Sequence, residues 1–222
     1  MTSFALKILA CITMFIDHLG YSIFHRFSFF NYIGRLAFPI FAFQITEGFV
    51  HTKNIKKYFL RLGIFAIISQ IPFALFHSTF STDFSLNIFF TLLLGLLGIY
   101  LYEKLSSYKI IGLAIVIGIS YIAELIKVDY GYWGILVIFA FYLFKENRAL
   151  TILSFFALLC IKYVPNLLLS NFYYVYFLLF LCTFLSIIPI LLYNKKQGRK
   201  IKYFLYFFYP VHLLLLYGLS FL

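Results

Sequence analysis

Apolar runs fill this chain almost from end to end, and short connectors between them contain most of its basic residues. Of the 222 residues, 64% are hydrophobic and only 11% are charged, whereas a soluble domain has about 25% charged residues. A run of about 20 apolar residues lets a helix cross a bilayer. The sequence therefore predicts an all-α integral membrane protein, a polytopic helical bundle, and excludes an ordinary soluble fold or a disordered chain.

The apolar runs predict about nine spans, within a range of eight to ten, in a single membrane domain over residues 1–222. Several runs are shorter than about 20 residues, so we expect tilted, broken or buried helices among them. The two runs on either side of residues 124–130 also fit one re-entrant hairpin. The first run lacks the features of a cleaved signal peptide, so we expect it to be retained. The predicted spans are Phe4–Phe24, Tyr32–Val50, Leu62–His77, Leu86–Leu101, Ile110–Ile126, Tyr130–Phe144, Ala149–Val164, Phe172–Tyr193 and Tyr203–Leu222.

The basic residues alternate between the two sides of this predicted bundle. The connectors after the second, fourth, sixth and eighth spans contain 13 Lys and Arg residues. The other four, with Lys162 counted from the end of the seventh span, contain only Arg26, Lys127 and Lys162. Lys and Arg are enriched in cytoplasmic loops, which predicts a cytoplasmic N-terminus and an external C-terminus. We assign the net charge of +11 to this topology and expect no nucleic-acid partner.

Asp17 and His18 in the first predicted span and Arg35 in the second are ionisable, and all three can lie at the same depth in the outer half of the membrane. Charge within hydrocarbon is costly, so such residues indicate a functional site. Asp17 and His18 are adjacent and point about 100° apart on a helix, so we expect Asp17 to pair with Arg35 or to cap a break near Gly20. His18 is then a candidate general base. The alternatives are a packed histidine and a purely structural Asp17–Arg35 pair.

A basic cluster follows the second span and contains Lys53, Lys56, Lys57 and Arg61. These side chains are candidates to bind the phosphates of a nucleotide-like cofactor, and anionic lipid head groups are the alternative partners. Arg35 and Asn87 are candidate donors to an oxyanion. The cysteines show no metal-ligand spacing, and we predict no metal site. The remaining pocket candidates are Glu47, His51, Asn87, Glu124, Asp129 and His212.

The combined order of the motifs, over most of the chain, resembles the TraX family. The motifs are Lys7 with Ile16-Asp17-His18, the run Gly34 to Phe43, Glu47-Gly48-Phe49, Leu60-Arg61-Leu62, Ser69-Gln70-Ile71-Pro72, Asn87 with Thr91 and Gly95, Asp129-Tyr130-Gly131 and Tyr209-Pro210-Val211-His212. The resemblance implies a multi-pass protein of the bacterial cell membrane that uses acetyl-CoA as acyl donor, and the named member of the family acetylates the N-terminus of conjugative pilin. It also implies that an intramembrane histidine acts in catalysis, for which His18 is the best candidate.

Two functions follow from these observations, and a third alternative, a non-catalytic membrane scaffold, would have no need of ionisable groups inside the membrane. The first is an acetyltransferase that acts on an amine or hydroxyl of a peptide, a pilin N-terminus or a cell-surface molecule. The second is a proton-coupled transporter or permease, in which Asp17, His18, Arg35 and Glu47 form a proton relay. No inverted repeat is visible in the sequence, which weighs against a transporter.

Overall fold

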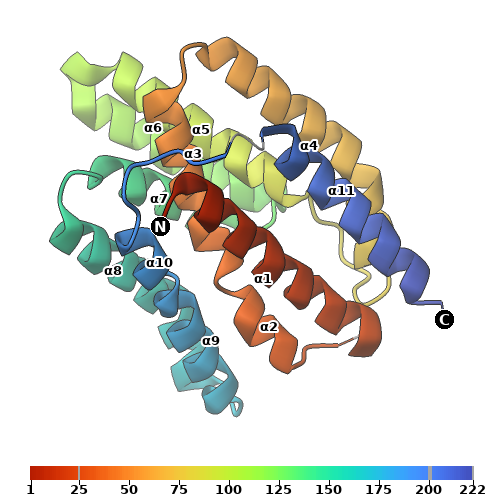
Figure 1. Ribbon diagram of the computed structural model, residues 1–222. Coiled ribbons are helices and arrows are strands. Elements are labelled where there is room, and N and C mark those ends of the chain that lie inside the picture. Colours follow the sequence, from red (N-terminus) through yellow and green to blue (C-terminus); the bar gives the residue numbers. More distant parts are fainter. Residues whose placement is uncertain (25, 200–201, 222) are drawn as a thin grey trace.

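The computed structural model describes residues 1–24, 26–199 and 202–221, and within these ranges the chain is a bundle of helices without a β-strand (Figure 1). The predicted all-α class is therefore confirmed. Lys200 and Leu222, which belong to a predicted connector and to the predicted ninth span, lie outside the described residues. The helices are α1 (Ser3–Phe24), α2 (Phe29–Gly34), α3 (Ala37–His51), α4 (Ile55–His77), α5 (Ile88–Lys104), the short 3-10 helix η1 (Ser106–Tyr108), α6 (Lys109–Leu125), α7 (Gly131–Leu143), α8 (Arg148–Leu169), α9 (Tyr173–Leu185), α10 (Ile187–Leu191) and α11 (Lys202–Leu219).

Each of the nine predicted spans contains a helix, but the count of nine membrane spans is not confirmed. Six helical stretches in the described ranges are long and apolar enough to cross a membrane, namely α1, α2–α3, α4, η1–α6, α8 and α9–α10. Helix α7 and the described part of α11 are apolar but shorter. The chain is therefore a multi-pass membrane protein with six candidate spans.

Helix α7 is short because it lies in the centre of the bundle. It packs against α3, α5, α6 and α8, and ten of its 13 residues are buried, Trp133 and Ile135 among them. A helix that is apolar on every face is stable only when other helices surround it. Helix α7 therefore does not need the length of a helix that faces lipid on its own.

The third predicted span begins too late, because α4 extends toward the N-terminus as far as Ile55. The side chain of Asn54 caps the helix by accepting a hydrogen bond from the backbone N–H of Lys57, at 2.9 Å. Lys56, Lys57 and Arg61 therefore lie within α4, which corrects their predicted place in a connector. Hydropathy underestimates the length of a helix with a basic end, because its long basic side chains can extend toward the membrane surface while the backbone stays helical.

The second predicted span is broken between α2 and α3, at Arg35 and Leu36. Pro39 explains the position of the break, because its ring excludes the helical carbonyl four residues earlier, that of Arg35. Pro39 is the third residue of α3, where its missing N–H has no partner within the helix in any case. The break before Pro39 thus places Arg35 at the C-terminal end of α2.

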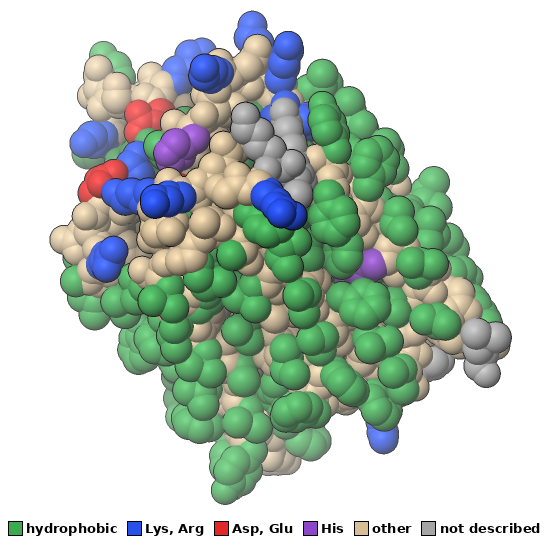
Figure 2. Space-filling model, viewed as in Figure 1, with side chains coloured by type: hydrophobic (Ala, Val, Ile, Leu, Met, Phe, Trp, Pro, Cys, Tyr) green, Lys and Arg blue, Asp and Glu red, His purple; other side chains and the backbone are tan. Residues whose placement is uncertain are grey.

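Basic side chains gather at one end of the molecule, over the connection between α3 and α4 and the segment that leads from α10 to α11, whereas apolar side chains cover the body below (Figure 2). The first residues of the chain are held at this end by backbone pairing. The N–H of Ser3 donates to the carbonyl of Lys196 at 2.9 Å, and that of Phe4 to the carbonyl of Gln197 at 3.0 Å. This pairing joins the start of α1 to the segment before α11.

Candidate functional site

Two cavities lie on opposite sides of a wall inside the bundle. The first, the basic cavity, has a volume of about 670 Å³. The second, the histidine cavity, has a volume of about 260 Å³ and is lined by Asp17, His18, Arg35 and Asp129. Met14, Ile88 and Tyr209 line both cavities. The wall is therefore one side chain thick at these three positions.

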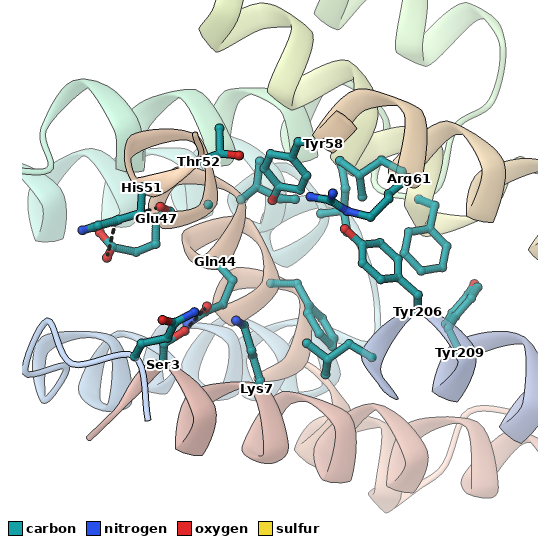
Figure 3. A pocket seen from close by; sticks show the side chains of 18 of the residues that line it. Ser3, Lys7, Gln44, Glu47, His51, Thr52, Tyr58, Arg61, Tyr206 and Tyr209 are labelled. Atoms are coloured by element: carbon teal, nitrogen blue, oxygen red, sulfur yellow. Dashed lines mark hydrogen bonds and ion pairs between the residues drawn. The ribbon is translucent and has the colours of Figure 1, made fainter. Parts of the chain in front are cut away.

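The basic cavity carries a strong excess of positive charge. Among the described residues that line it, five are cationic and one, Glu47, is a carboxylate. Figure 3 shows side chains entering it from three directions, with Lys7 on α1, Gln44 on α3, and Arg61 on α4. The cavity is thus suited to bind a polyanion. The five cations are Lys7, Lys53, Arg61, Lys195 and Arg199.

Lys195 and Arg199 reach the basic cavity through the segment between α10 and α11. Gly198 lies in this segment with φ +70°, and a Cβ there would lie 2.9 Å from the side chain of Phe4. Only glycine combines this left-handed backbone with so close an approach. The segment can therefore lie directly on the start of α1 and form one edge of the cavity.

His18 lines the histidine cavity and contacts a second imidazole, His212, which is not among the residues that line either cavity. The Nδ1 atom of His18 on α1 lies 2.7 Å from the Nε2 atom of His212 on α11. The Nδ1 atom of His212 in turn lies 2.7 Å from the carbonyl oxygen of Phe208. His212 was predicted from the sequence as a pocket candidate, but its contact with His18 was not.

These contacts fix the tautomers of the neutral pair. A carbonyl oxygen can only accept, so the Nδ1–H of His212 donates to Phe208, and the Nε2 lone pair of His212 accepts the Nδ1–H of His18. The Nε2 atom of His18 then keeps its lone pair. His18 lines the cavity, so this nitrogen is the candidate base and His212 is the candidate group that orients it.

The predicted pair of Asp17 and Arg35 is present beside the histidines, with Arg35 Nη2 at 3.0 Å from Asp17 Oδ1. Asn31, which is fully buried, donates to the same Oδ1 at 3.0 Å, and its backbone oxygen accepts from Arg35 Nε at 3.1 Å. Gly34 makes this arrangement possible, since a Cβ there would lie 2.2 Å from Oδ1 of Asp17. The pair is thus held rigidly at the cavity.

Asp129 reaches the histidine cavity from the connection between α6 and α7. Its backbone N–H donates to the carbonyl of Leu86 at 2.8 Å, and its carbonyl accepts from the Thr91 hydroxyl. Tyr130 follows with φ 65°, a left-handed conformation that is costly for a tyrosine, and its ring stacks on Phe38 with centroids 3.8 Å apart. Burial raises the pKa of Asp129 to about 6, although Arg35 and Lys162 oppose the rise.

Lys162, which the sequence predicts only as a connector charge, also lines the histidine cavity. Its Nζ atom lies 3.9 Å from the ring centre of Trp133 and 4.9 Å from that of Tyr130. Aromatic faces stabilise a cation that is withdrawn from water. The signal that could have identified Lys162 is its isolation in a long apolar run, which marks a functional candidate in a membrane protein.

The structure places several of the other predicted site residues at the basic cavity, away from His18. Glu47 and His51 line the basic cavity, with His51 Nδ1 3.7 Å from a carboxylate oxygen of Glu47. Lys53 and Arg61 line it too, whereas Lys56 and Lys57 are not among its lining residues. No group of three or more His, Cys, Asp or Glu side chains in the described ranges is placed to hold a metal ion.

Asn87 and Glu124, also predicted as pocket candidates, have local contacts outside the two cavities described above. The Nδ2 group of Asn87 donates to the Ala66 carbonyl and to Gln70 Oε1, both at 2.8 Å, so no amide hydrogen is left for an oxyanion. Its Oδ1 atom caps α5. Glu124 is exposed and accepts from the N–H of Tyr132 at 3.2 Å. Neither residue lines either cavity.

Known proteins resemble this chain over nearly its whole length. A family model described as "TraX protein" matches residues 3–220, a range that includes the residues of both cavities. The "Probable fimbrial assembly protein FimC, serogroup H1" of Dichelobacter nodosus is 30% identical over an alignment of 241 positions, which covers 97% of this chain and 94% of the relative. No solved structure matches the chain.

Proposed function

Because the chain belongs to the TraX family, we propose that it is a membrane acetyltransferase that moves an acetyl group from acetyl-CoA to an amine or hydroxyl. The family resemblance supplies the reaction. The observation that carries the proposal is the arrangement of two cavities with different chemistry on the two sides of a thin wall. A relative named as a probable fimbrial assembly protein supports a peptide or pilin acceptor over a small metabolite.

The basic cavity fits the acyl donor. Coenzyme A is polyanionic at its nucleotide end, and the five cations at this cavity exceed its one carboxylate. Lys53 and Arg61 are the predicted phosphate ligands that line it. The thioester end would reach His18 past the side chains of Met14 and Tyr209, which belong to both cavities.

The histidine cavity supplies the groups that acyl transfer needs. His18 Nε2 accepts the proton of the attacking amine or hydroxyl, while His212 holds the ring in place. Arg35 is the candidate donor to the oxyanion, since it lines the cavity and its side chain is 20% exposed. His18 then returns the proton to the thiolate of coenzyme A, which leaves the acetylated acceptor and free coenzyme A as products.

Charge distribution gives the proposed orientation. The end where Lys and Arg gather (Figure 2) would face the cytoplasm under the positive-inside rule, which is also where acetyl-CoA is made. The histidine cavity would then receive its acceptor from the outer side. The proposal therefore places acyl donor and acceptor on opposite sides of a bacterial cell membrane.

The direct test uses the purified protein in detergent or lipid nanodiscs. Isothermal titration should detect acetyl-CoA binding, and a peptide with a free N-terminal amine should yield an acetylated product with release of one thiol per transfer. The rate should rise with pH until the acceptor amine is deprotonated. Absence of acetyl-CoA binding by folded protein would refute the proposal. Proton-coupled uptake of a solute into proteoliposomes would favour the transporter instead.

A further inference from the structure

We propose that Gln44 recognises an amide carbonyl oxygen in the pantetheine arm of the acyl donor, inside the basic cavity. The inference rests on the proposed function, because it assumes that acetyl-CoA occupies this cavity. It assigns Gln44 as a specificity-determining residue that distinguishes an amide-containing arm from a purely apolar or purely anionic ligand.

The amide of Gln44 is fixed in orientation and has unused donors. Its Oε1 atom accepts a hydrogen bond from the Ser3 hydroxyl at 2.8 Å, so the Nε2 group is directed away from Ser3. The residue is only 8% exposed, and Nε2 is buried without a hydrogen-bond partner. Buried polar groups are normally paired. An unpaired amide on a cavity wall therefore indicates a ligand atom that accepts from it.

In the part of the chain that the structure describes, most buried side-chain nitrogen and oxygen atoms without a hydrogen-bond partner belong to residues that line this cavity. Among the described residues, four buried side-chain polar atoms lack a hydrogen-bond partner, and three of them belong to Gln44, Glu47 and Arg61. The Glu47 atom is the carboxylate oxygen that has its 3.7 Å ion-pair contact with His51. All three residues line the basic cavity. In Figure 3, Gln44 extends from α3 toward Ser3 at the start of α1, with Lys7 beside it and Arg61 farther away on α4. This distribution indicates that the cavity receives a polar ligand.

The position of Gln44 along α3 matches the middle of an extended donor. His51 lines the basic cavity near one end of α3, and Ala37 lines the histidine cavity at the other. Gln44 is seven residues from each, or about 10 Å along the axis at 1.5 Å per residue. Phosphates would lie with the cations and the thioester near His18. The part of the donor between them contains two amides, whose carbonyl oxygens are neutral acceptors.

The test combines a change in the protein with a change in the ligand. Gln44→Leu removes the amide, and an acetyl-CoA analogue with one arm carbonyl replaced by methylene, made for each of the two amides, removes the acceptor. We expect each single change to raise the dissociation constant about tenfold, and the effects of Gln44→Leu and of the relevant analogue not to add. Adenosine 3′,5′-bisphosphate, which lacks the arm, should bind wild type and variant equally.

A second variant keeps the test valid if Gln44→Leu folds poorly. Ser3→Ala leaves the Gln44 side chain in place but releases its amide orientation, and it should weaken acetyl-CoA several-fold without affecting the bisphosphate. Equal affinity of wild type for acetyl-CoA and both analogues would overturn the inference while leaving the proposed function intact. Loss of bisphosphate binding in either folded variant would also overturn it, because Gln44 would then face the nucleotide end. Failure of wild type to bind acetyl-CoA would refute the proposed function itself.

Discussion

His18 Nδ1 lies 2.7 Å from His212 Nε2, and this contact joins the first and the last helix at the histidine cavity. The Phe208 carbonyl fixes His212, and His212 in turn fixes His18. The hydrogen bonds thus run from the Phe208 carbonyl to His212, the proposed orienting residue, and from His212 to His18, the proposed base. This order makes separate predictions for the two imidazoles.

Replacement of the base should affect the chemical step alone. His18→Ala should lower turnover by about 10²–10⁴-fold, the usual contribution of general base catalysis, and should leave acetyl-CoA affinity unchanged because the proposed phosphate site lies in the other cavity. His212→Phe should cause a smaller loss, since the base remains without its orienting partner. Leu19→Ala, a truncation at the next position, is the control. Near wild-type turnover in folded His18→Ala would exclude His18 as the base.

The pair of Asp17 and Arg35 should contribute to stability as well as to activity. Asp17→Asn leaves Arg35 without a counter-charge and places amide hydrogens against the donor of Asn31. We expect a loss of about 3 kcal/mol in the free energy of unfolding, the lower end for a broken buried pair, because the Arg35 side chain keeps 20% exposure. Unfolding in denaturant measures it. If Asp17→Asn with Arg35→Gln is no more stable than Asp17→Asn alone, the stranded charge is not the cause.

Gly34 should be intolerant of the smallest side chain. Gly34→Ala places a Cβ 2.2 Å from Oδ1 of Asp17, which forces α2 away from α1 and separates Arg35 from Asp17. Both thermal stability and turnover should fall. The matched control is Gly63→Ala in α4, where a Cβ has no neighbour within 4 Å and should stabilise the helix by up to about 1 kcal/mol. Equal effects at the two glycines would contradict the close approach.

The four basic residues around the start of α4 should differ in their effect on acetyl-CoA affinity. Lys53→Glu and Arg61→Glu should weaken acetyl-CoA binding, with a loss that shrinks at high salt, because both residues line the basic cavity. Lys56→Glu and Lys57→Glu change the same charge within the same cluster but lie outside the cavity lining, so they serve as controls. Titration calorimetry at low and high salt gives the comparison. Equal losses for all four would indicate a general surface effect.

Asp129 should make the stability depend on pH. Its pKa is raised from 3.8 to about 6 by burial, so the folded protein binds this proton more tightly than the unfolded chain. The resulting stabilisation is present below about pH 4, and it is lost as the pH rises through about 6. Asp129→Asn remains neutral and should lack this loss, so it should unfold at higher temperature than wild type at pH 7. The difference should disappear near pH 4.

The sequence predicted the Asp17–Arg35 pair because charge in an apolar run is rare and needs a partner. Depth in the membrane, taken from the alternation of basic connectors, was sufficient to bring Asp17, His18 and Arg35 together. The same reasoning placed Glu47 in a different region, and the structure puts it in the other cavity. The pairing and the approximate depth of charged residues inside a membrane can thus be predicted from the sequence alone.

Side-chain geometry at long range was not predictable in this way. His212 was recognised as a candidate, but its contact with His18 depends on how α11 packs between α1 and α4, and no local pattern encodes this packing. Asn31 and Lys162 were missed for related reasons. Asn31 occupies a short helix with its own cap hydrogen bond to Ser28, and its role toward Asp17 appears only when α2 folds back on α1.

The contact between His18 and His212 spans 194 positions of the chain, which determines when the site can exist during biosynthesis. A ribosome releases the helices in order, so a nascent chain displays His18 long before α11 has been made. Until then the base has no orienting partner, and the segment that carries Lys195 and Arg199 has not yet completed the basic cavity. Under the proposed function, we therefore expect an incomplete chain in the membrane to be inactive toward acetyl-CoA, and only the finished molecule to have both cavities complete.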